Sequence, residues 1–172
     1  SYSYATVNMA NLYYLFSANW VATSQSVGWA LPLVFGVLCA IWAAVTFCRQ
    51  RKCNMPLFWL ESLVTGCFAV YYFILTLVQP SYTLIGVPAM ALCILLTLGM
   101  YLRGNDLKHL PLAGGILFVL LCCFGLKMHE RYLFPALLLL GLAFLQRRDR
   151  RIFAILMIGS LTMFLNAGIV LD

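Results

Sequence analysis

Residues Leu110–Pro135 read LPLAGGILFVLLCCFGLKMHERYLFP, and this stretch contains both features that decide the fold of the chain. Its first part, Leu110–Leu126, is an uncharged and mainly apolar run, and a helix needs about 20 such residues to cross the hydrocarbon core of a membrane. Its second part places four ionisable residues within Lys127–Arg131, just before another apolar run. The stretch therefore predicts two membrane-spanning helices joined by a charged turn.

The same alternation of apolar runs and short polar turns extends along the chain. Hydrophobic residues make up 64% and charged residues 9% of the 172 residues, and no water-soluble domain of this size could cover such a chain with polar surface. We expect an all-α integral membrane protein, with an interfacial helix or loop at residues 1–26 and a six-span bundle over residues 27–172. The six predicted spans are Val27–Cys48, Leu57–Val78, Tyr82–Leu102, Leu110–Leu126, Tyr132–Gln146 (short for a full crossing) and Ile152–Leu171.

The basic residues predict the orientation of these spans. The formal charge is +6, but Lys and Arg are concentrated in short clusters between apolar runs, which argues against nucleic acid as a partner. Turns on one side carry nine of the eleven basic residues: Arg49, Arg51, Lys52, Arg103, Lys108, Arg147, Arg148, Arg150 and Arg151. By the positive-inside rule this side faces the cytoplasm. Residues 1–26 and the turn Lys127–Arg131 then face outward from the cell membrane.

The outward turn has two interpretations. The first is an ordinary interfacial loop, in which Lys127 favours the carbonyl end of the preceding helix and Glu130 pairs with Arg131. The second is an anion site, because the next span begins here and offers free backbone N–H groups beside His129, Arg131 and Lys127. Pro135 fits the first turn of that span, where a missing N–H costs little. The anion site favours a ligand that carries phosphate.

The segment Tyr2–Trp20 is rich in asparagine and aromatic residues. Tyr4, Asn8, Asn11 and Leu15 recur at helical spacing, which predicts one face of an interfacial helix. Amide groups and flat aromatic faces suit the hydroxyls and apolar faces of a sugar. The alternative is an aromatic belt helix with amide caps, and the sequence does not separate the two.

Other ionisable residues carry less information. Glu61, in the second span, is expected to be partnered or hydrated near the interface, with an ion path as the alternative. His109 and His129 are predicted on opposite faces and cannot share a metal ion. The seven cysteines show no metal-type spacing, so we expect reduced packing residues. Nothing in the sequence supports a cofactor in this chain, and a divalent metal in a longer enzyme stays open.

The motifs occur in an order that resembles a known family. Met128–Pro135 (MHERYLFP) opens a leucine-rich span and resembles the C-terminal part of prokaryotic GPI-mannosyltransferase-like membrane proteins, which are type C, polyprenyl-phosphate-sugar-dependent glycosyltransferases. Tyr4–Asn8 (YATVN), then Asn11-Leu12 and Asn19-Trp20, resemble the segment that such proteins carry before their C-terminal spans. The resemblance covers most of the chain, and the intervening spans match only in hydropathy.

The resemblance implies a partial type C glycosyltransferase fold and an inverting enzyme. Such an enzyme transfers a hexose, here mannose, from a polyprenyl-phosphate donor to an extracytoplasmic glycan or protein acceptor. Arg131, Lys127 and His129 would bind the lipid phosphate, and Glu130 and His129 would act in catalysis. The residues expected to position the sugar or acceptor are Tyr4, Asn8, Asn11, Asn19, Trp20 and Tyr132.

The same resemblance implies that part of the active site lies elsewhere. Such enzymes carry a catalytic acid in their first outward loop, so the chain is expected to be the C-terminal half of a larger protein. Three other functions stay open: a flippase for a lipid-linked sugar, another polytopic transporter, and a structural subunit of a membrane complex. Apart from Glu61, the spans offer no charged residue for a transport path.

Overall fold

The computed structural model describes residues 4–5, 11–53, 56–104 and 106–171, and these residues form helices without any strand. Two isolated antiparallel bridges, Tyr4 with Ala22 and Ser26 with Ser81, tie the segment before the first long helix to itself and to a later turn. The helices are α1 (Leu12–Leu15), α2 (Ala30–Cys53), α3 (Pro56–Leu75), α4 (Tyr82–Gly104), α5 (Leu110–Phe124), α6 (Leu133–Arg147) and α7 (Arg150–Leu171), with 3-10 turns η1 (Leu107–His109) and η2 (Glu130–Tyr132).

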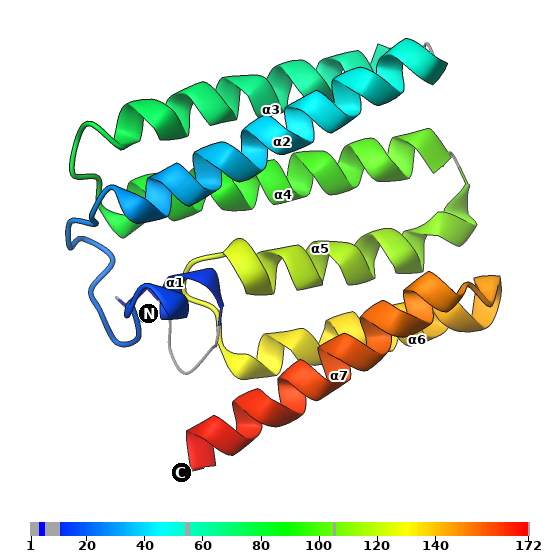
Figure 1. The fold of residues 1–172 in the computed structure, drawn as a ribbon. Coiled ribbons are helices and arrows are strands. Elements are labelled where there is room, and N and C mark those ends of the chain that lie inside the picture. Colours follow the sequence, from blue (N-terminus) through cyan, green and yellow to red (C-terminus); the bar gives the residue numbers. More distant parts are fainter. Residues whose placement is uncertain (1–3, 6–10, 54–55, 105, 172) are drawn as a thin grey trace.

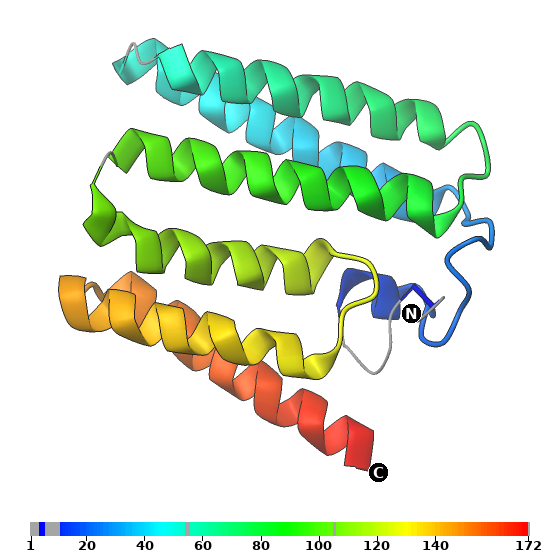
Figure 2. The same ribbon diagram turned by 180° about the vertical axis from the view of Figure 1, so that it is seen from behind.

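Six long helices lie side by side and alternate in direction (Figures 1 and 2). The α2–α3 pair is followed by α4, then by α5, and finally by α6 and α7. We call the end that carries the C-termini of α2, α4 and α6 the basic end. The other end, with α1, the α3–α4 turn and the α5–α6 turn, is called the loop end. The charged turn Lys127–Arg131 therefore lies at the end opposite the arginine-rich turns.

Each long helix coincides with one of the six apolar runs, so the all-helical prediction is confirmed. Within the described part of the chain, four helices are long and apolar enough to cross a membrane: Ala30–Arg51, Pro56–Leu75, Tyr82–Gly104 and Leu107–Phe124. Helix α6 has 15 residues and is shorter than a full crossing, as predicted. Large apolar side chains such as Ile41, Leu63 and Val70 point outward with more than half of their surface exposed. Such a surface suits lipid rather than water. The total of six spans remains a prediction.

The C-terminal ends of α2 and α3 differ from the predicted span boundaries by three to five residues. We expected the first span to end at Cys48 and a loop to follow, but α2 continues to Cys53. Arg, Gln and Lys are good helix formers, so the polar residues that follow Cys48 continue the helix instead of forming a loop. Arg49 and Arg51 consequently lie on the last turns of α2. At the loop end, α3 stops at Leu75, three residues before the predicted boundary at Val78.

A proline inside α4 is accommodated by two tyrosines of α3. Pro88 has no N–H, so the carbonyl of Leu84, one turn earlier, loses its helical donor. The Tyr71 hydroxyl donates to that carbonyl at 2.8 Å, and the Tyr72 hydroxyl donates to the next one, Ile85, also at 2.8 Å. Because a membrane offers little water to satisfy a backbone group, these bonds are what permits a proline there.

The segment before α2 is less helical than predicted. Among the residues described there, only Leu12–Leu15 form a helix, and Tyr4 lies in the bridge to Ala22 instead. Asn11 is 5% exposed while Leu15 is 77% exposed, so these two residues do not share one face. The chain turns away after α1 because Ser17 and Trp20 adopt left-handed backbone conformations, both with φ of 59°.

Candidate functional site

The two sequence motifs meet at the loop end of the bundle. The backbone N–H of Lys127 donates to the carbonyl of Ala5 at 2.8 Å, and the Tyr13 hydroxyl donates to the carbonyl of Phe124 at 3.0 Å. Tyr13 is fully buried, and Gly86 of α4 has no room for a side chain because a Cβ there would meet Leu126 and, at 2.8 Å, the Tyr13 hydroxyl. The N-terminal segment, the α5–α6 turn and α4 therefore form one packed unit.

The conformation of the α5–α6 turn sets the direction of the charged residues. Helix α5 ends as the Gly125 N–H donates to the carbonyl of Leu121 at 2.7 Å. Lys127 then adopts a left-handed conformation with φ of 60°, which reverses the chain at a cost of about 1 kcal/mol. The Tyr132 N–H donates to the carbonyl of His129 at 3.0 Å, closing the turn η2, and α6 starts at the next residue.

The basic side chains of this turn differ in how deeply they are buried. Lys127 is exposed and Arg131 is exposed, whereas His129 is buried at 8% exposure. The His129 ring meets the ring of Tyr132 edge to face, with centroids 5.6 Å apart. The backbone of Glu130 lies in η2, and its side chain is outside the described part of the structure. Two exposed basic side chains and one buried imidazole thus lie in the turn that precedes α6.

The start of α6 adds to the positive character of this turn. Its first N–H groups have no partner inside the helix, and Tyr132 at the N-cap position provides no side-chain acceptor for them. Pro135 lies in the first turn as expected, where its missing N–H leaves fewer donors unsatisfied. The N-terminus of α6 favours negative charge, and so do the guanidinium of Arg131 and the ammonium of Lys127 in the turn before it. The arrangement can therefore hold an anion.

Asn11 has hydrogen-bond partners inside the protein, as the amide-cap alternative expects. Its side-chain oxygen accepts from the N–H of Tyr14 at 3.1 Å and caps α1, and its Nδ2 donates to the carbonyl of Gly125 at 3.5 Å. Both ends of the amide are used inside the protein, which favours the amide-cap interpretation over sugar binding. Sequence spacing could not show this, because the capping depends on where the short helix begins.

Tyr13 is a residue of this region that the motif pattern missed. Besides its bond to Phe124, its ring packs against Phe35 of α2 and Tyr82 of α4, with centroids 6.0 and 6.3 Å away. Burial raises the pKa of the Tyr13 phenol, with a smaller contribution from Cys93, so the hydroxyl stays protonated and can donate. The only sequence signal was an aromatic residue beside the Asn-rich stretch.

The remaining residues of the Asn-rich segment lie at the edge of this region. Tyr4 and Trp20 meet edge to face with ring centroids 5.3 Å apart, and about half of the Trp20 surface is exposed. Asn19 is half-buried next to them. Asn8, also predicted to bind sugar, lies outside the described residues. A partly exposed aromatic pair therefore borders the turn that carries the cations.

The basic end holds a separate set of charges. Glu61 is buried, forms an ion pair with Arg103 of α4 and accepts from the Trp42 Nε1 at 2.9 Å, so the expectation of a partnered carboxylate is confirmed. His109 contacts Arg147 there, with 3.1 Å between the ring Nε2 and the Nη2. His109 and His129 thus lie at opposite ends. Within the described ranges, no group of three or more His, Cys, Asp or Glu side chains could hold a metal ion.

No family model, curated protein or solved structure matches this chain.

The cysteines that the structure describes are unpaired thiols, with Cys39, Cys93 and Cys122 buried between helices.

Proposed function

We propose that this chain is part of a membrane glycosyltransferase that moves a hexose, with mannose as the first choice, from a polyprenyl-phosphate donor to an extracytoplasmic acceptor. The observation that carries the proposal is the meeting of the Lys127–Arg131 turn with the Tyr4–Trp20 segment, beside the N-terminus of α6. A phosphate anchored at that turn would hold its hexose close to the Tyr4–Trp20 aromatic pair.

The reaction needs charge stabilisation at the leaving group. An acceptor hydroxyl attacks the anomeric carbon from the face opposite the phosphate, and the bond between that carbon and the phosphate oxygen breaks. The bonding electrons leave with the phosphate, so its oxygens gain negative charge in the transition state. Arg131 and Lys127 supply cations for these oxygens, and preorganised cations of this kind lower the barrier.

Proton transfer completes the proposed reaction. The acceptor hydroxyl loses its proton to a carboxylate, and by the resemblance the main base comes from an outward loop beyond this chain. Glu130 either assists as a base or orients Arg131. His129 donates to the phosphate from its buried position below the two exposed cations. The acceptor is a glycan or a protein outside the cytoplasm.

The test is turnover by the full-length protein in proteoliposomes with a radiolabelled polyprenyl-phosphate mannose. Arg131→Ala should lower the transfer rate about a hundredfold or more, because it removes a donor to the developing charge. Arg131→Lys should retain part of the activity. Arg150→Ala, at the basic end, serves as the matched control and should leave the rate unchanged, since Arg150 lies at the opposite end of the bundle.

Two outcomes would contradict the proposal. If Arg131→Ala turned over at the wild-type rate, the phosphate would not be bound as described. If the labelled lipid crossed the membrane with its hexose still attached and no hexose appeared on any acceptor, the protein would be a flippase instead.

A further inference from the structure

A half-open cavity of about 490 Å³ lies between helices α2, α3, α4 and α5, away from the charged turn. Its volume falls in the range of small-ligand pockets, about 300–1,000 Å³. Its walls are almost entirely apolar, with side chains such as Leu38, Leu92, Leu96, Ile116 and Leu120. The polar exceptions are mostly at one end, where Arg49 and Arg103 line it. The cavity thus complements an amphipathic lipid, because it is long and apolar and has positive charge at one end.

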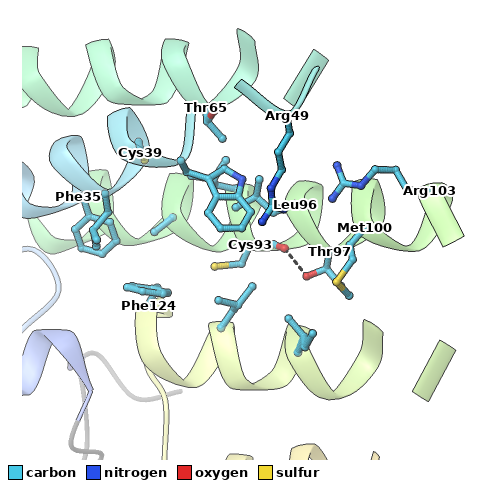
Figure 3. Close-up of a pocket in the computed structure, with 16 residues that line it drawn as sticks. Phe35, Cys39, Arg49, Thr65, Cys93, Leu96, Thr97, Met100, Arg103 and Phe124 are labelled. Carbon is cyan, nitrogen blue, oxygen red and sulfur yellow. Dashed lines mark hydrogen bonds between the residues drawn. The ribbon is translucent and has the colours of Figure 1, made fainter. Parts of the chain in front are cut away.

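Figure 3 shows which residues lie at the other end of the cavity. Phe35 of α2 and Phe124 of α5 lie there, with ring centroids 5.9 Å apart, while both guanidinium groups lie at the opposite end. At about 1.5 Å of rise per residue, Phe35 and Arg49 are about 21 Å apart along α2. One leaflet of the hydrocarbon core is about 15 Å thick. The cavity is therefore long enough for one hydrocarbon chain of a single leaflet and its headgroup.

The two arginines differ in how they are held. Arg103 is fixed by its ion pair with Glu61 and by the ring of Phe58, which lies 4.6 Å from the guanidinium carbon. Arg49 is exposed, and among the residues that the structure describes it has no acidic partner. The charge of Arg103 is balanced by Glu61, so one positive charge, on Arg49, is left to be balanced. An occupant with a single negative charge complements this end.

We propose that the cavity binds one anionic glycerophospholipid of the leaflet at the basic end. One acyl chain lies between α2, α4 and α5, and the phosphodiester is bound by Arg49 and by the remaining N–H groups of Arg103. In a bilayer a half-open apolar cavity fills with lipid chains, and basic pockets between membrane helices select anionic headgroups. A polyprenyl-phosphate donor is a poorer fit, because in the proposed reaction its phosphate must reach the opposite end of the bundle. The cavity and its charge are independent of the proposed transfer reaction. The choice of a glycerophospholipid over a polyprenyl phosphate rests on that proposed function.

The test is lipid retention by the purified chain. The protein is placed in nanodiscs of equimolar phosphatidylcholine and phosphatidylglycerol, extracted with mild detergent, and the lipids that remain bound are counted by native mass spectrometry. Wild type should retain one phosphatidylglycerol in preference to phosphatidylcholine. Arg49→Gln should lower that preference about tenfold, because it removes the charge-assisted hydrogen bonds to the phosphodiester.

A matched control is two residues further along the same helix. Arg51 lies over the ring of Phe47, 5.1 Å from its centroid, and does not line the cavity. Arg51→Gln should leave the preference unchanged. Equal losses in Arg49→Gln and Arg51→Gln would mean that general surface charge attracts the lipid, and would overturn the proposal.

A second pair of variants tests the position of the chain. Leu96→Trp fills the cavity, whereas Leu95→Trp changes the neighbouring residue, which is 47% exposed and outside the cavity lining. Leu96→Trp alone should abolish retention. Three results would contradict the proposed occupant. The Leu96→Trp protein could still retain the lipid, or the wild type could retain phosphatidylcholine as strongly as phosphatidylglycerol. The third is displacement of the bound lipid by added polyprenyl phosphate.

Discussion

At the scale of single residues, the loop end separates groups that hold the fold from groups that face outward. Asn11 and Tyr13 make their hydrogen bonds to the backbone around Phe124 and Gly125, whereas Lys127 and Arg131 extend from the surface of the same turn. Substitutions in the first group should therefore change stability. Substitutions in the second should change function without changing stability.

Asn11 gives a direct test of this division. Asn11→Ala removes the N-cap of α1 and the bond to Gly125, which should lower stability by about 1–2 kcal/mol. Asn11→Ser keeps a capping oxygen and should recover part of the loss. The measurement is the thermal-unfolding midpoint of the purified protein in one detergent. If Asn11→Ala kept the wild-type midpoint while the KM for the acceptor of the full-length enzyme rose, Asn11 would bind substrate after all.

The sequence carried part of the information about these residues. The cations could be predicted, because Lys127 and Arg131 stand in an otherwise apolar region and the next span had to begin there. The amides could not, because spacing alone does not tell a capping asparagine from one that binds sugar. The left-handed backbone of Lys127, with φ of 60°, could not be predicted either, because lysine, unlike glycine or asparagine, gives no sequence signal for that conformation.

At the scale of helices, two hydrogen bonds join α3 to α4 one turn before the proline of α4. The carbonyl that Pro88 leaves without a helical donor is satisfied by Tyr71, and Tyr72 supports the next one. The two tyrosines of α3 therefore donate hydrogen bonds to backbone carbonyls of the neighbouring helix α4. Periodicity predicted both helices but could not predict this contact, because it joins residues on different helices.

A double-mutant cycle measures that contact. Tyr71→Phe should lower stability by about 1–3 kcal/mol, since it leaves the Leu84 carbonyl unsatisfied. In a Pro88→Ala background the new N–H can bond that carbonyl, so the same substitution should cost much less. Thermal unfolding of the four proteins gives the coupling energy. Equal costs in both backgrounds would show that Tyr71 acts through packing alone.

At the scale of the whole molecule, charge is divided between the two ends. The arginine-rich turns lie at the basic end, and the Lys127–Arg131 turn lies at the loop end with the N-terminal segment. This division could be predicted from the order of apolar runs and basic clusters. The cavity with Arg49 and Arg103 could not, because α2 was expected to end before Arg49 and the cavity needs four helices to form.

The orientation in the membrane can be tested with single cysteines in a cysteine-free protein. Gln79 lies exposed in the α3–α4 turn at the loop end, and Leu107 is 76% exposed at the basic end. In intact cells a membrane-impermeant maleimide should label Gln79→Cys but label Leu107→Cys only after permeabilisation, as the positive-inside rule requires. The reverse pattern would place the Lys127–Arg131 turn in the cytoplasm and remove the basis for an extracytoplasmic reaction.

The central claim is that the Lys127–Arg131 turn binds the phosphate of a lipid-linked sugar, and equilibrium binding to this chain tests it most directly. Polyprenyl-phosphate mannose is titrated into the purified protein in phosphatidylcholine nanodiscs, with the uncharged polyprenol as reference. We predict tight binding of the phosphate lipid alone, weakened about tenfold or more by Arg131→Ala and unchanged by Arg150→Ala. Equal affinity for the phosphate lipid and the polyprenol, or an Arg131→Ala protein that binds as wild type does, would contradict the account.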